Sequence, residues 1–535
     1  MGLVKSGNEL EARGDTVSVE KDPEGMQSLK MIARGGGLYF FGLITSKILA
    51  YVYRIFIAQY FGPADYGVFS MGLALIGFFE AVALLGLSRG VIRYIAFYSQ
   101  KKEEAKLRGV ISSSVRLAMP LSFILLATML AFSPLLSEAV FSNAQLGIVL
   151  AVLSFSLPFT VTFLLINSFF IGFKRMDYQI YSEVLTANSM RLLFILLFGM
   201  LGLGLAGLSL AWTMAAVVTA VISVFMLRRI FPFRSMIKSL PMKKELLLFS
   251  FPLLFTNFML LITTYTDTLM IGIFKAAEDV GIYNAAVPTA RLLTMFPYAL
   301  NALFLPVITS LYALKKEDDL AGVYRTVSKW LLYLNAPLLF AFIFFPRQII
   351  TLIFGPMYAE GYSAMLFLTI GFFISGFSIL SFNLLNMYKK TKYILYVTIV
   401  NTLVNVVLNL ALIPVFGIDG AAFASMTMYA VSFCLYQALI FRMTGIRQIS
   451  RSFVKTAVLA AVAFISVYGI FMALIPEQGI PLIIAFSLLA LLFYMLLVSY
   501  FRALSREDIE MLKTIERKSN MKLSLIRRLL KKVIR

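Results

Sequence analysis

The chain has 535 residues, of which 60% are hydrophobic and 14% are charged, and its formal net charge is +21. Soluble globular domains carry about a quarter charged residues, so this composition excludes a soluble protein and indicates an all-α protein that crosses the membrane many times. Histidine is absent and Cys434 is the single cysteine, which excludes a histidine proton relay, a histidine-ligated metal site and an intramolecular disulfide.

Most of the positive charge lies beside apolar segments, as membrane topology and anionic lipid headgroups require. We therefore expect the lipid bilayer, and not nucleic acid, to be the partner of most Lys and Arg residues. Residues 1–29 are polar and mixed in charge, without the apolar core of a signal peptide. They predict a disordered cytoplasmic tail, with the first transmembrane helix acting as the signal anchor.

A membrane-spanning helix needs about 20 mainly apolar residues, and by this rule the sequence predicts fourteen transmembrane helices. They cover residues 36–60, 68–96, 110–132, 146–172, 183–203, 204–227, 246–274, 281–311, 327–345, 362–388, 393–415, 420–441, 454–475 and 481–501. Lys and Arg are concentrated in the even-numbered loops, whereas the odd-numbered loops carry only Lys275 and Arg347. Cytoplasmic loops are the basic ones, so both termini are expected to be cytoplasmic.

Two pairs of matching segments indicate an internal repeat. Residues 66–70 (YGVFS) match 280–284 (VGIYN) at an offset of 214, and residues 173–175 (FKR) match 388–390 (YKK) at an offset of 215. An even number of helices per repeat predicts two parallel six-helix bundles related by a pseudo-two-fold axis along the membrane normal. The predicted organisation is a tail (1–29), an N-terminal bundle (30–229), a basic cytoplasmic linker (230–245), a C-terminal bundle (246–442), an appended helix pair (443–502) and a basic amphipathic cytoplasmic tail (503–535).

Several charged residues lie inside the predicted helices, where an Arg or Lys near the bilayer centre costs roughly 2.5 to 3.5 kcal/mol on translocon scales. A rise of about 1.5 Å per residue places four of them near mid-membrane, namely Lys47, Glu80, Arg191 and Arg291. The others lie toward the outer side (Arg54 and Asp267) or toward the inner side (Arg89 and Arg93). The positive excess at mid-membrane predicts a cavity balanced by water, counterions or an anionic substrate. Phosphate fits, because guanidinium groups bind it with paired hydrogen bonds.

Structural roles compete with functional ones at some of these positions. Arg89 and Arg93 could extend to the inner headgroups, and Glu80 could simply neutralise Lys47. The eleventh helix carries an asparagine stripe that could either join helices by hydrogen bonds or line a sugar-binding cavity, namely Asn401, Asn405 and Asn409.

The eighth predicted helix is longer than a simple span, and prolines flank its arginine. Pro288 precedes Arg291, and Pro297 and Pro306 follow it, so a kink or a break is expected. The sequence has no Walker phosphate loop, no catalytic triad and no large extramembrane loop. We therefore expect a transporter and not an enzyme, without catalytic residues, a bound metal or a cofactor.

The first hairpin carries a family resemblance. Residues 54–69 (RIFIAQYFGPADYGVF) resemble the first-hairpin signature of prokaryotic polysaccharide-biosynthesis flippases, which belong to the multidrug/oligosaccharidyl-lipid/polysaccharide (MOP) exporter superfamily. Residues 352–358 (LIFGPMY) and 389–392 (KKTK) resemble the same family, so the similarity runs from about residue 30 to 501. The resemblance implies a V-shaped pair of six-helix bundles around a cationic cavity.

The resemblance also implies an activity, namely transfer of a polyprenyl- or dolichyl-(pyro)phosphate-linked oligosaccharide from the cytoplasmic to the outer leaflet of the plasma membrane. Alternating access would drive this step of cell-surface polysaccharide or glycoprotein assembly, with a glycan polymerase or glycosyltransferase machinery as a partner. In the related peptidoglycan-lipid flippases, arginines of helices one, two and eight contact the diphosphate, and the last helix pair forms a groove for the lipid tail. The residues in corresponding helices here are Arg54, Arg89 or Arg93, and Arg291.

These considerations assign a role to each charged residue. We expect the substrate phosphate at Lys47, Arg54, Arg191 and Arg291. Glu80 or Asp267 would balance charge or couple transport to a Na⁺ or H⁺ gradient, and the membrane potential is the other candidate energy source. The competing function is a multidrug or organic-cation antiporter of the same superfamily, which would need an acidic cavity.

Overall fold

The computed structural model describes residues 23–231, 240–474 and 480–501. Most of the predicted N-terminal tail, most of the basic linker and the predicted amphipathic tail after residue 502 lie outside these residues. Within them the regular elements are all helical. The first are α1 (Pro23–Leu84), α2 (Leu87–Gln100), α3 (Glu104–Leu135), η1 (Leu136–Val140), α4 (Ala144–Ser154), α5 (Leu157–Gly172), α6 (Met176–Ile180), η2 (Tyr181–Asn188), α7 (Ser189–Met200) and α8 (Gly204–Ile230).

The second half of the chain continues the same pattern of apolar helices. Its elements are α9 (Lys243–Phe274), α10 (Ala277–Ala290), η4 (Arg291–Thr294), α11 (Met295–Ala313), α12 (Glu317–Phe344), α13 (Pro346–Phe354), η5 (Pro356–Gly361), α14 (Tyr362–Met387), α15 (Thr391–Thr444), α16 (Arg451–Leu474) and α17 (Ile480–Tyr500). The predicted break in the eighth helix is confirmed, because the 3₁₀ turn η4 at Arg291 separates α10 from α11.

Two of the longest helices contain a sharp kink at a glycine. Gly62 in α1 has φ 78° and ψ 173°, and Gly417 in α15 has φ 58° and ψ −131°, so each element joins two helices across a non-helical residue. Glycine adopts such angles without a Cβ penalty. In α1, Pro63 directly follows Gly62. It suits the first turn of the helix that begins there, because an N–H at this position would have no intrahelical acceptor.

Eleven helices of the described chain are long and apolar enough to cross a membrane, or twelve if α4 and α5, bent by 50°, form one span. In that count α1 and α15 each stand as one helix, although each joins two. The count is lower than the fourteen spans expected from the sequence, so fourteen stays a prediction.

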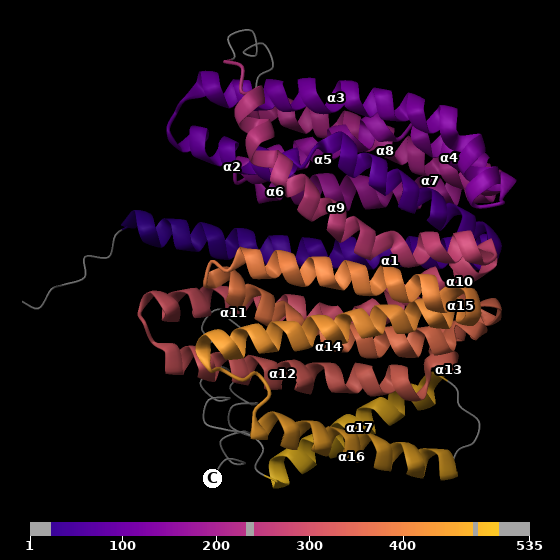
Figure 1. The fold of residues 1–535 in the computed structure, drawn as a ribbon, viewed down its shortest axis with the longest axis vertical. Coiled ribbons are helices and arrows are strands. Elements are labelled where there is room, and N and C mark those ends of the chain that lie inside the picture. Colours follow the sequence, from indigo (N-terminus) through magenta and orange to yellow (C-terminus); the bar gives the residue numbers. More distant parts are fainter. Residues whose placement is uncertain (1–22, 232–239, 475–479, 502–535) are drawn as a thin grey trace, which may run out of the picture.

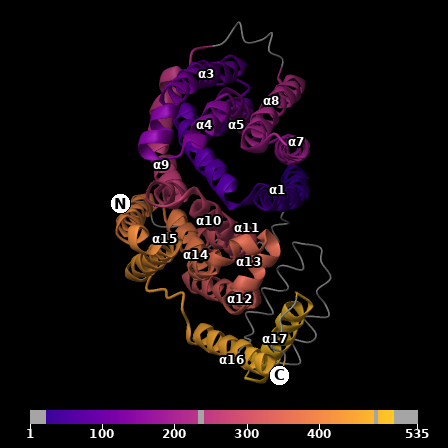
Figure 2. The ribbon, with the colours of Figure 1, turned by 90° about the vertical axis from the view of Figure 1, so that its right-hand side faces the viewer.

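The helices gather in two groups, with α1 between them (Figure 1). One group contains α2 to α8, and the other contains α10 to α15. Helix α9 crosses from one to the other, since it packs on α2 and α3 and also on α15. Helices α16 and α17 pack on α12, at the opposite end of the molecule from α3 and α8 (Figure 2).

The apolar core is continuous at one end of the helices and divided at the other. One cluster joins α1 near Phe69 with α10 near Tyr283 and extends to Phe486 of α17. Two separate clusters fill the other end, one around Phe170 in the first group and one around Tyr324 in the second. The two groups are therefore packed together at one end of the helices and have independent cores at the other.

Glycines allow the groups to meet closely at the shared end. A Cβ on Gly67 would lie 1.7 Å from the carbonyl oxygen of Ala277, and a Cβ on Gly281 would lie 1.9 Å from that of Pro63. The contact is reciprocal, and it joins the two segments that the sequence comparison matched. Any side chain larger than hydrogen at either glycine would force the backbones apart.

Helix α9 reaches the first group at the break between α1 and α2. Leu85 and Gly86 have φ of 49° and 69°, and a Cβ on Gly86 would lie 2.6 Å from the carbonyl oxygen of Ser250 in α9. The break therefore makes room for the backbone of α9.

Candidate functional site

A cavity of about 280 Å³ lies among helices α1, α5, α7, α8, α9 and α10. Its charged lining residues are Arg54, Glu80 and Arg191. Its aromatic lining residues are Tyr53, Tyr66, Phe69, Phe163, Trp212 and Tyr265. Two cations and one carboxylate thus share one enclosed, aromatic space, which leaves a positive excess.

Arg54 lies on α1 among phenol groups. Tyr53, Tyr66 and Tyr265 are its electrostatic neighbours, and the Tyr66 hydroxyl donates a hydrogen bond to the carbonyl oxygen of Asn284 at 3.2 Å. Because phenol oxygens are weak partners compared with a carboxylate, the guanidinium keeps donors for a ligand.

Arg191 lies in the first turn of α7, a helix that directly follows the π-helical segment η2. Its guanidinium carbon lies 4.2 Å from the centroid of the Trp212 ring, a cation–π contact. It is also the charge that acts on Glu80. Within the described residues, Glu80 forms no ion pair within 4.0 Å, and the Thr160 hydroxyl on α5 is its hydrogen-bonding neighbour.

The remaining predicted phosphate ligands lie outside this cavity. Lys47 is exposed on α1, and no Lys47–Glu80 ion pair exists in the described part of the chain. Charge neutralisation by direct pairing of these two residues was therefore a wrong alternative. Arg291 is exposed at the η4 turn, 5.3 Å from the centroid of Phe372. It acts electrostatically on Tyr265, which lines the cavity, as do Arg54 and Glu80.

Arg89 and Arg93 are exposed on α2 and do not line the cavity. The guanidinium carbon of Arg93 lies 4.5 Å from the ring centroid of Phe249 on α9. The side chain therefore stacks at the contact between α2 and α9.

Asp267 occupies a second polar site, buried in the other helix group. Its Oδ1 accepts hydrogen bonds from the amides of Asn405 at 3.1 Å and Asn409 at 2.7 Å. Its Oδ2 accepts from the hydroxyls of Tyr283 at 2.5 Å and Ser425 at 2.6 Å. Four donors from α10 and α15 thus hold one carboxylate on α9.

The asparagine stripe of α15 faces this carboxylate. Asn405 and Asn409 are fully buried, and their side-chain oxygens have no hydrogen-bond partner among the described atoms. Asn401 donates to the hydroxyl of Ser432 at 3.0 Å. In this state the stripe joins helices by hydrogen bonds and does not line the cavity.

A family model described as polysaccharide biosynthesis protein matches residues 32–312, which is more than half of the chain. The chain belongs to this family. The MatE family model matches residues 252–411, overlapping the first match from residue 252 to 312.

Relatives and solved structures agree with that membership. The chain is 24% identical over 424 residues to an uncharacterized membrane protein of Methanocaldococcus jannaschii, MJ1068, covering 74% of this chain and 82% of that protein. It is 22% identical to the probable low-salt glycan biosynthesis flippase Agl15 of Haloferax volcanii, covering 38% of this chain and 43% of that protein. The fold is similar to the lipid II flippase MurJ in an inward closed conformation, with a TM-score of 0.71, 15% identity and coverage of 87% of this chain and 98% of that one. It is also similar to an inward-facing multidrug resistance MATE transporter, with a TM-score of 0.62 and 17% identity over 75% of this chain and 95% of that one.

The structure adds aromatic residues that the sequence reasoning had missed in this family member. Trp212, Tyr66 and Tyr265 lie in the cavity wall, and Tyr283 is a partner of Asp267. An aromatic residue in an apolar helix gives no signal of its own, because the lipid face and the core use the same residues. One signal was available, since Trp212 is one of only two tryptophans in the chain.

Proposed function

We propose that this flippase moves a polyprenyl- or dolichyl-(pyro)phosphate-linked oligosaccharide from the cytoplasmic to the outer leaflet of the plasma membrane. The observation that carries the proposal is the cavity, where Arg54 and Arg191 face a single carboxylate, Glu80. An enclosed positive excess attracts an anion, and arginine binds phosphate oxygens through two parallel hydrogen bonds. Arg291, which acts electrostatically on the lining residue Tyr265, would meet the same phosphate when the cavity widens.

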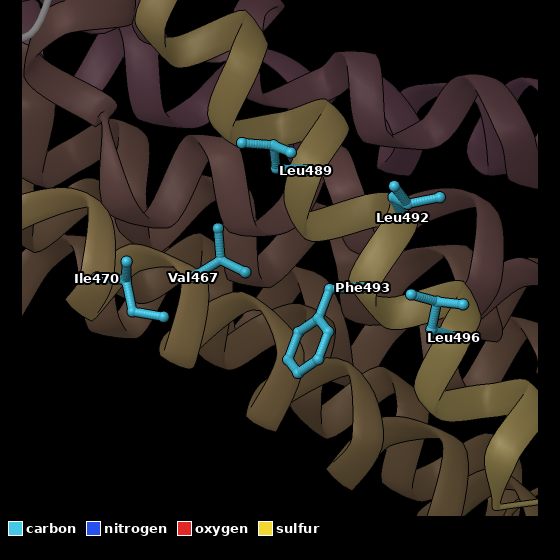
Figure 3. Close-up of a pocket in the computed structure, with 6 residues that line it drawn as sticks. All are labelled: Val467, Ile470, Leu489, Leu492, Phe493 and Leu496. Atoms are coloured by element: carbon cyan, nitrogen blue, oxygen red, sulfur yellow. The ribbon is translucent and has the colours of Figure 1, made fainter.

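The size of the cavity supports a division of the substrate into three parts. A volume of about 280 Å³ suits the phosphate groups, and an oligosaccharide would extend into the space between the two helix groups. The isoprenoid tail would stay in the lipid. A wholly apolar groove of about 310 Å³ between α16 and α17 suits such a tail (Figure 3). Its lining residues are Val467, Ile470, Leu489, Leu492, Phe493 and Leu496.

Alternating access requires two groups of helices that move against each other. Dividing α1 at Gly62 and α15 at Gly417 would turn the twelve spans into the fourteen expected from the sequence. The predicted topology puts the closely packed glycine contact at the outer side and the divided core at the cytoplasmic side. The described state would then be closed toward the outer leaflet, with both termini in the cytoplasm.

Asp267 is our candidate for coupling transport to a Na⁺ or H⁺ gradient. Beside its carboxylate lie the two buried side-chain oxygens of Asn405 and Asn409 that have no partner in the described residues. Oxygen ligands of this kind suit a small hard cation. Because α9 carries Asp267 at one end and contacts α2 at the other, occupation of this site would bias the position of α9. The membrane potential acting on a charged substrate is the other energy source.

An organic-cation antiporter is the second candidate function, and the match to the MatE model favours it. The aromatic wall of the cavity could receive a flat cation. The charge of the cavity opposes it, since two arginines outnumber one carboxylate.

The test is transfer of a fluorescent lipid-linked oligosaccharide in proteoliposomes. Arg54→Ala, Arg191→Ala and Arg291→Ala should each reduce the rate at least about 10-fold, the loss expected for one charged hydrogen-bonded contact. Arg347→Ala changes an exposed arginine outside the cavity and should leave the rate unchanged. Unchanged transfer in all three arginine variants would contradict the phosphate site, and gradient-driven uptake of a cationic dye would favour the antiporter.

A further inference from the structure

Trp212 occupies a particular place in the cavity wall. It lies on α8 (Gly204–Ile230), and its ring supports the guanidinium of Arg191 at 4.2 Å. Two other lining rings, those of Tyr53 and Phe69, contact it edge-on with centroid distances of 5.9 Å and 5.7 Å. The indole is therefore held by aromatic neighbours on α1, and it in turn holds a charged side chain of α7.

The contact with the Trp212 ring stabilises the charge of Arg191 in the cavity. A half-buried guanidinium needs a partner, because its charge is costly away from water. A carboxylate partner would occupy the N–H groups that a phosphate must reach. An aromatic face attracts the cation through its π electrons and leaves the in-plane N–H donors of the guanidinium unoccupied. Within the described residues, Arg191 forms no ion pair within 4.0 Å.

We propose that Trp212 is a positioning residue of the anion site: it holds the Arg191 guanidinium in the cavity wall with its donors free for the phosphate oxygens of the substrate. The inference rests on the proposed function, since it names how that same site is organised. Glu80 then balances Arg191 electrostatically without a direct bond, and the incoming phosphate has no ion pair to break.

The tryptophan content of the chain provides the measurement. Trp212 and Trp330 are the only tryptophans, and Trp330 lies on α12 outside the cavity. In a Trp330→Phe background, the emission of purified full-length protein in nanodiscs reports Trp212 alone. Titration with inorganic pyrophosphate should change this emission saturably, because the ligand binds the cation stacked on the ring. Arg54→Ala should weaken the titration.

Substitutions at Trp212 separate positioning from packing, with binding of radiolabelled pyrophosphate as the readout. Trp212→Leu removes the aromatic face and should raise the Kd about 10-fold, the order of a partly desolvated cation–π contact. Trp212→Phe keeps a smaller face and should restore much of the affinity. Trp330→Leu is the matched control, because it removes the other tryptophan, which lies on α12 outside the cavity, and its Kd should not change.

A double variant makes the test decisive. If Trp212 acts through Arg191, Trp212→Leu combined with Arg191→Ala should bind no more weakly than Arg191→Ala alone. Additive losses, or an unchanged Kd in Trp212→Leu, would overturn the positioning role and leave the phosphate site standing. Two results would overturn both the phosphate site and the role of Trp212 in it. One is that the parent protein binds no pyrophosphate, and the other is that Arg54→Ala does not change the binding.

Discussion

Two carboxylates inside the membrane have opposite surroundings. Asp267 is buried and accepts four hydrogen bonds. Glu80 is half-buried in the cavity wall and forms no ion pair within 4.0 Å in the described chain. The sequence placed both residues inside predicted helices, because the apolar segments around them are long enough to span a membrane. It could not separate their roles, because these depend on which neighbouring helix each face meets.

Removing the Asp267 carboxylate should destabilise the protein. Asp267→Ala leaves four buried donors without an acceptor, and each unsatisfied group costs about 1 to 3 kcal/mol. Asp267→Asn should cost less, because the hydroxyls of Tyr283 and Ser425 can turn to accept. Thermal melting in detergent measures both, with Asp319→Asn on the exposed end of α12 as the control. A melting temperature unchanged in Asp267→Ala would contradict the network, and a Na⁺-dependent rise confined to the parent would support cation binding.

Neutralising Glu80 should have a different effect. Glu80→Gln removes the negative charge from the cavity and keeps an oxygen acceptor for the Thr160 hydroxyl, so its melting temperature should stay near that of the parent. Pyrophosphate should bind at least about 3-fold more tightly at low salt, because an anion no longer meets a like charge at close range. Weaker binding in Glu80→Gln would argue that Glu80 is needed to hold Arg191 in place.

Four helices end with the same turn, in which a lysine adopts the left-handed conformation. Lys102, Lys174, Lys315 and Lys389 have φ between 55° and 59°. In each turn the lysine amide donates to the carbonyl three residues earlier, and the next amide donates to the carbonyl five residues earlier. This is the Schellman helix ending, where glycine is the usual left-handed residue. The sequence predicted these loops as basic and cytoplasmic but could not predict the backbone, since lysine is not a signal for that conformation.

The left-handed lysines give a stability prediction. Lys102→Gly should raise the free energy of unfolding by about 1 kcal/mol, because a Cβ in this conformation costs about 1 to 2 kcal/mol. Lys102→Ala removes the same charge but keeps the Cβ, so it should not stabilise. Thermal melting of the two variants separates the effect of backbone strain from the effect of the lost charge. Equal melting temperatures of Lys102→Gly and Lys102→Ala would contradict backbone strain at Lys102.

The reciprocal glycine contact should be intolerant of a methyl group. Gly67→Ala places a Cβ within 1.7 Å of the carbonyl oxygen of Ala277, so α1 and α10 must separate. We expect a fall in stability of more than about 2 kcal/mol, as for overpacking of a close contact. Gly322→Ala is the control, because nothing lies within 4 Å of its Cβ position. Equal thermal melting of the two variants would show that the helices can move apart without cost.

For the whole molecule, the sequence predicted which segments are helical better than it predicted how the helices are arranged. The depths of Arg54, Glu80 and Arg191 in the membrane stay predictions, whereas helical content and the break at Arg291 followed from the apolar segments and the flanking prolines. The crossing of α9 between the groups did not, because its contacts with α2 and α15 depend on the Gly86 break and on Asp267. Local sequence patterns do not predict long-range contacts of this kind.

Locking the shared end should stop transport. The Gln59 side chain of α1 donates to the carbonyl oxygen of Ile353 in α13 at 2.8 Å and so links α1 to the group of α10 to α15. In a Cys434→Ser background, Gln59→Cys with Ile353→Cys joined by a short reducible cross-linker should abolish transfer, and reduction should restore it. The pair Ser363→Cys and Asp419→Cys lies within one group, where Ser363 donates to Asp419 at 2.6 Å, and should transport when cross-linked. Full activity of the first cross-linked pair would show that this end does not open.

The glycine contact between α1 and α10 is self-complementary. Gly67 meets position 277, Gly281 meets position 63, and the two positions of each kind are separated by the same 214 residues. Reciprocity of this type is the mark of an isologous surface, the kind that joins identical subunits about a two-fold axis. A six-helix half carrying one copy of the hairpin would therefore present a patch that fits its own twin. Fusion of two such halves in one chain would let the rest of each half diverge while this patch stayed fixed.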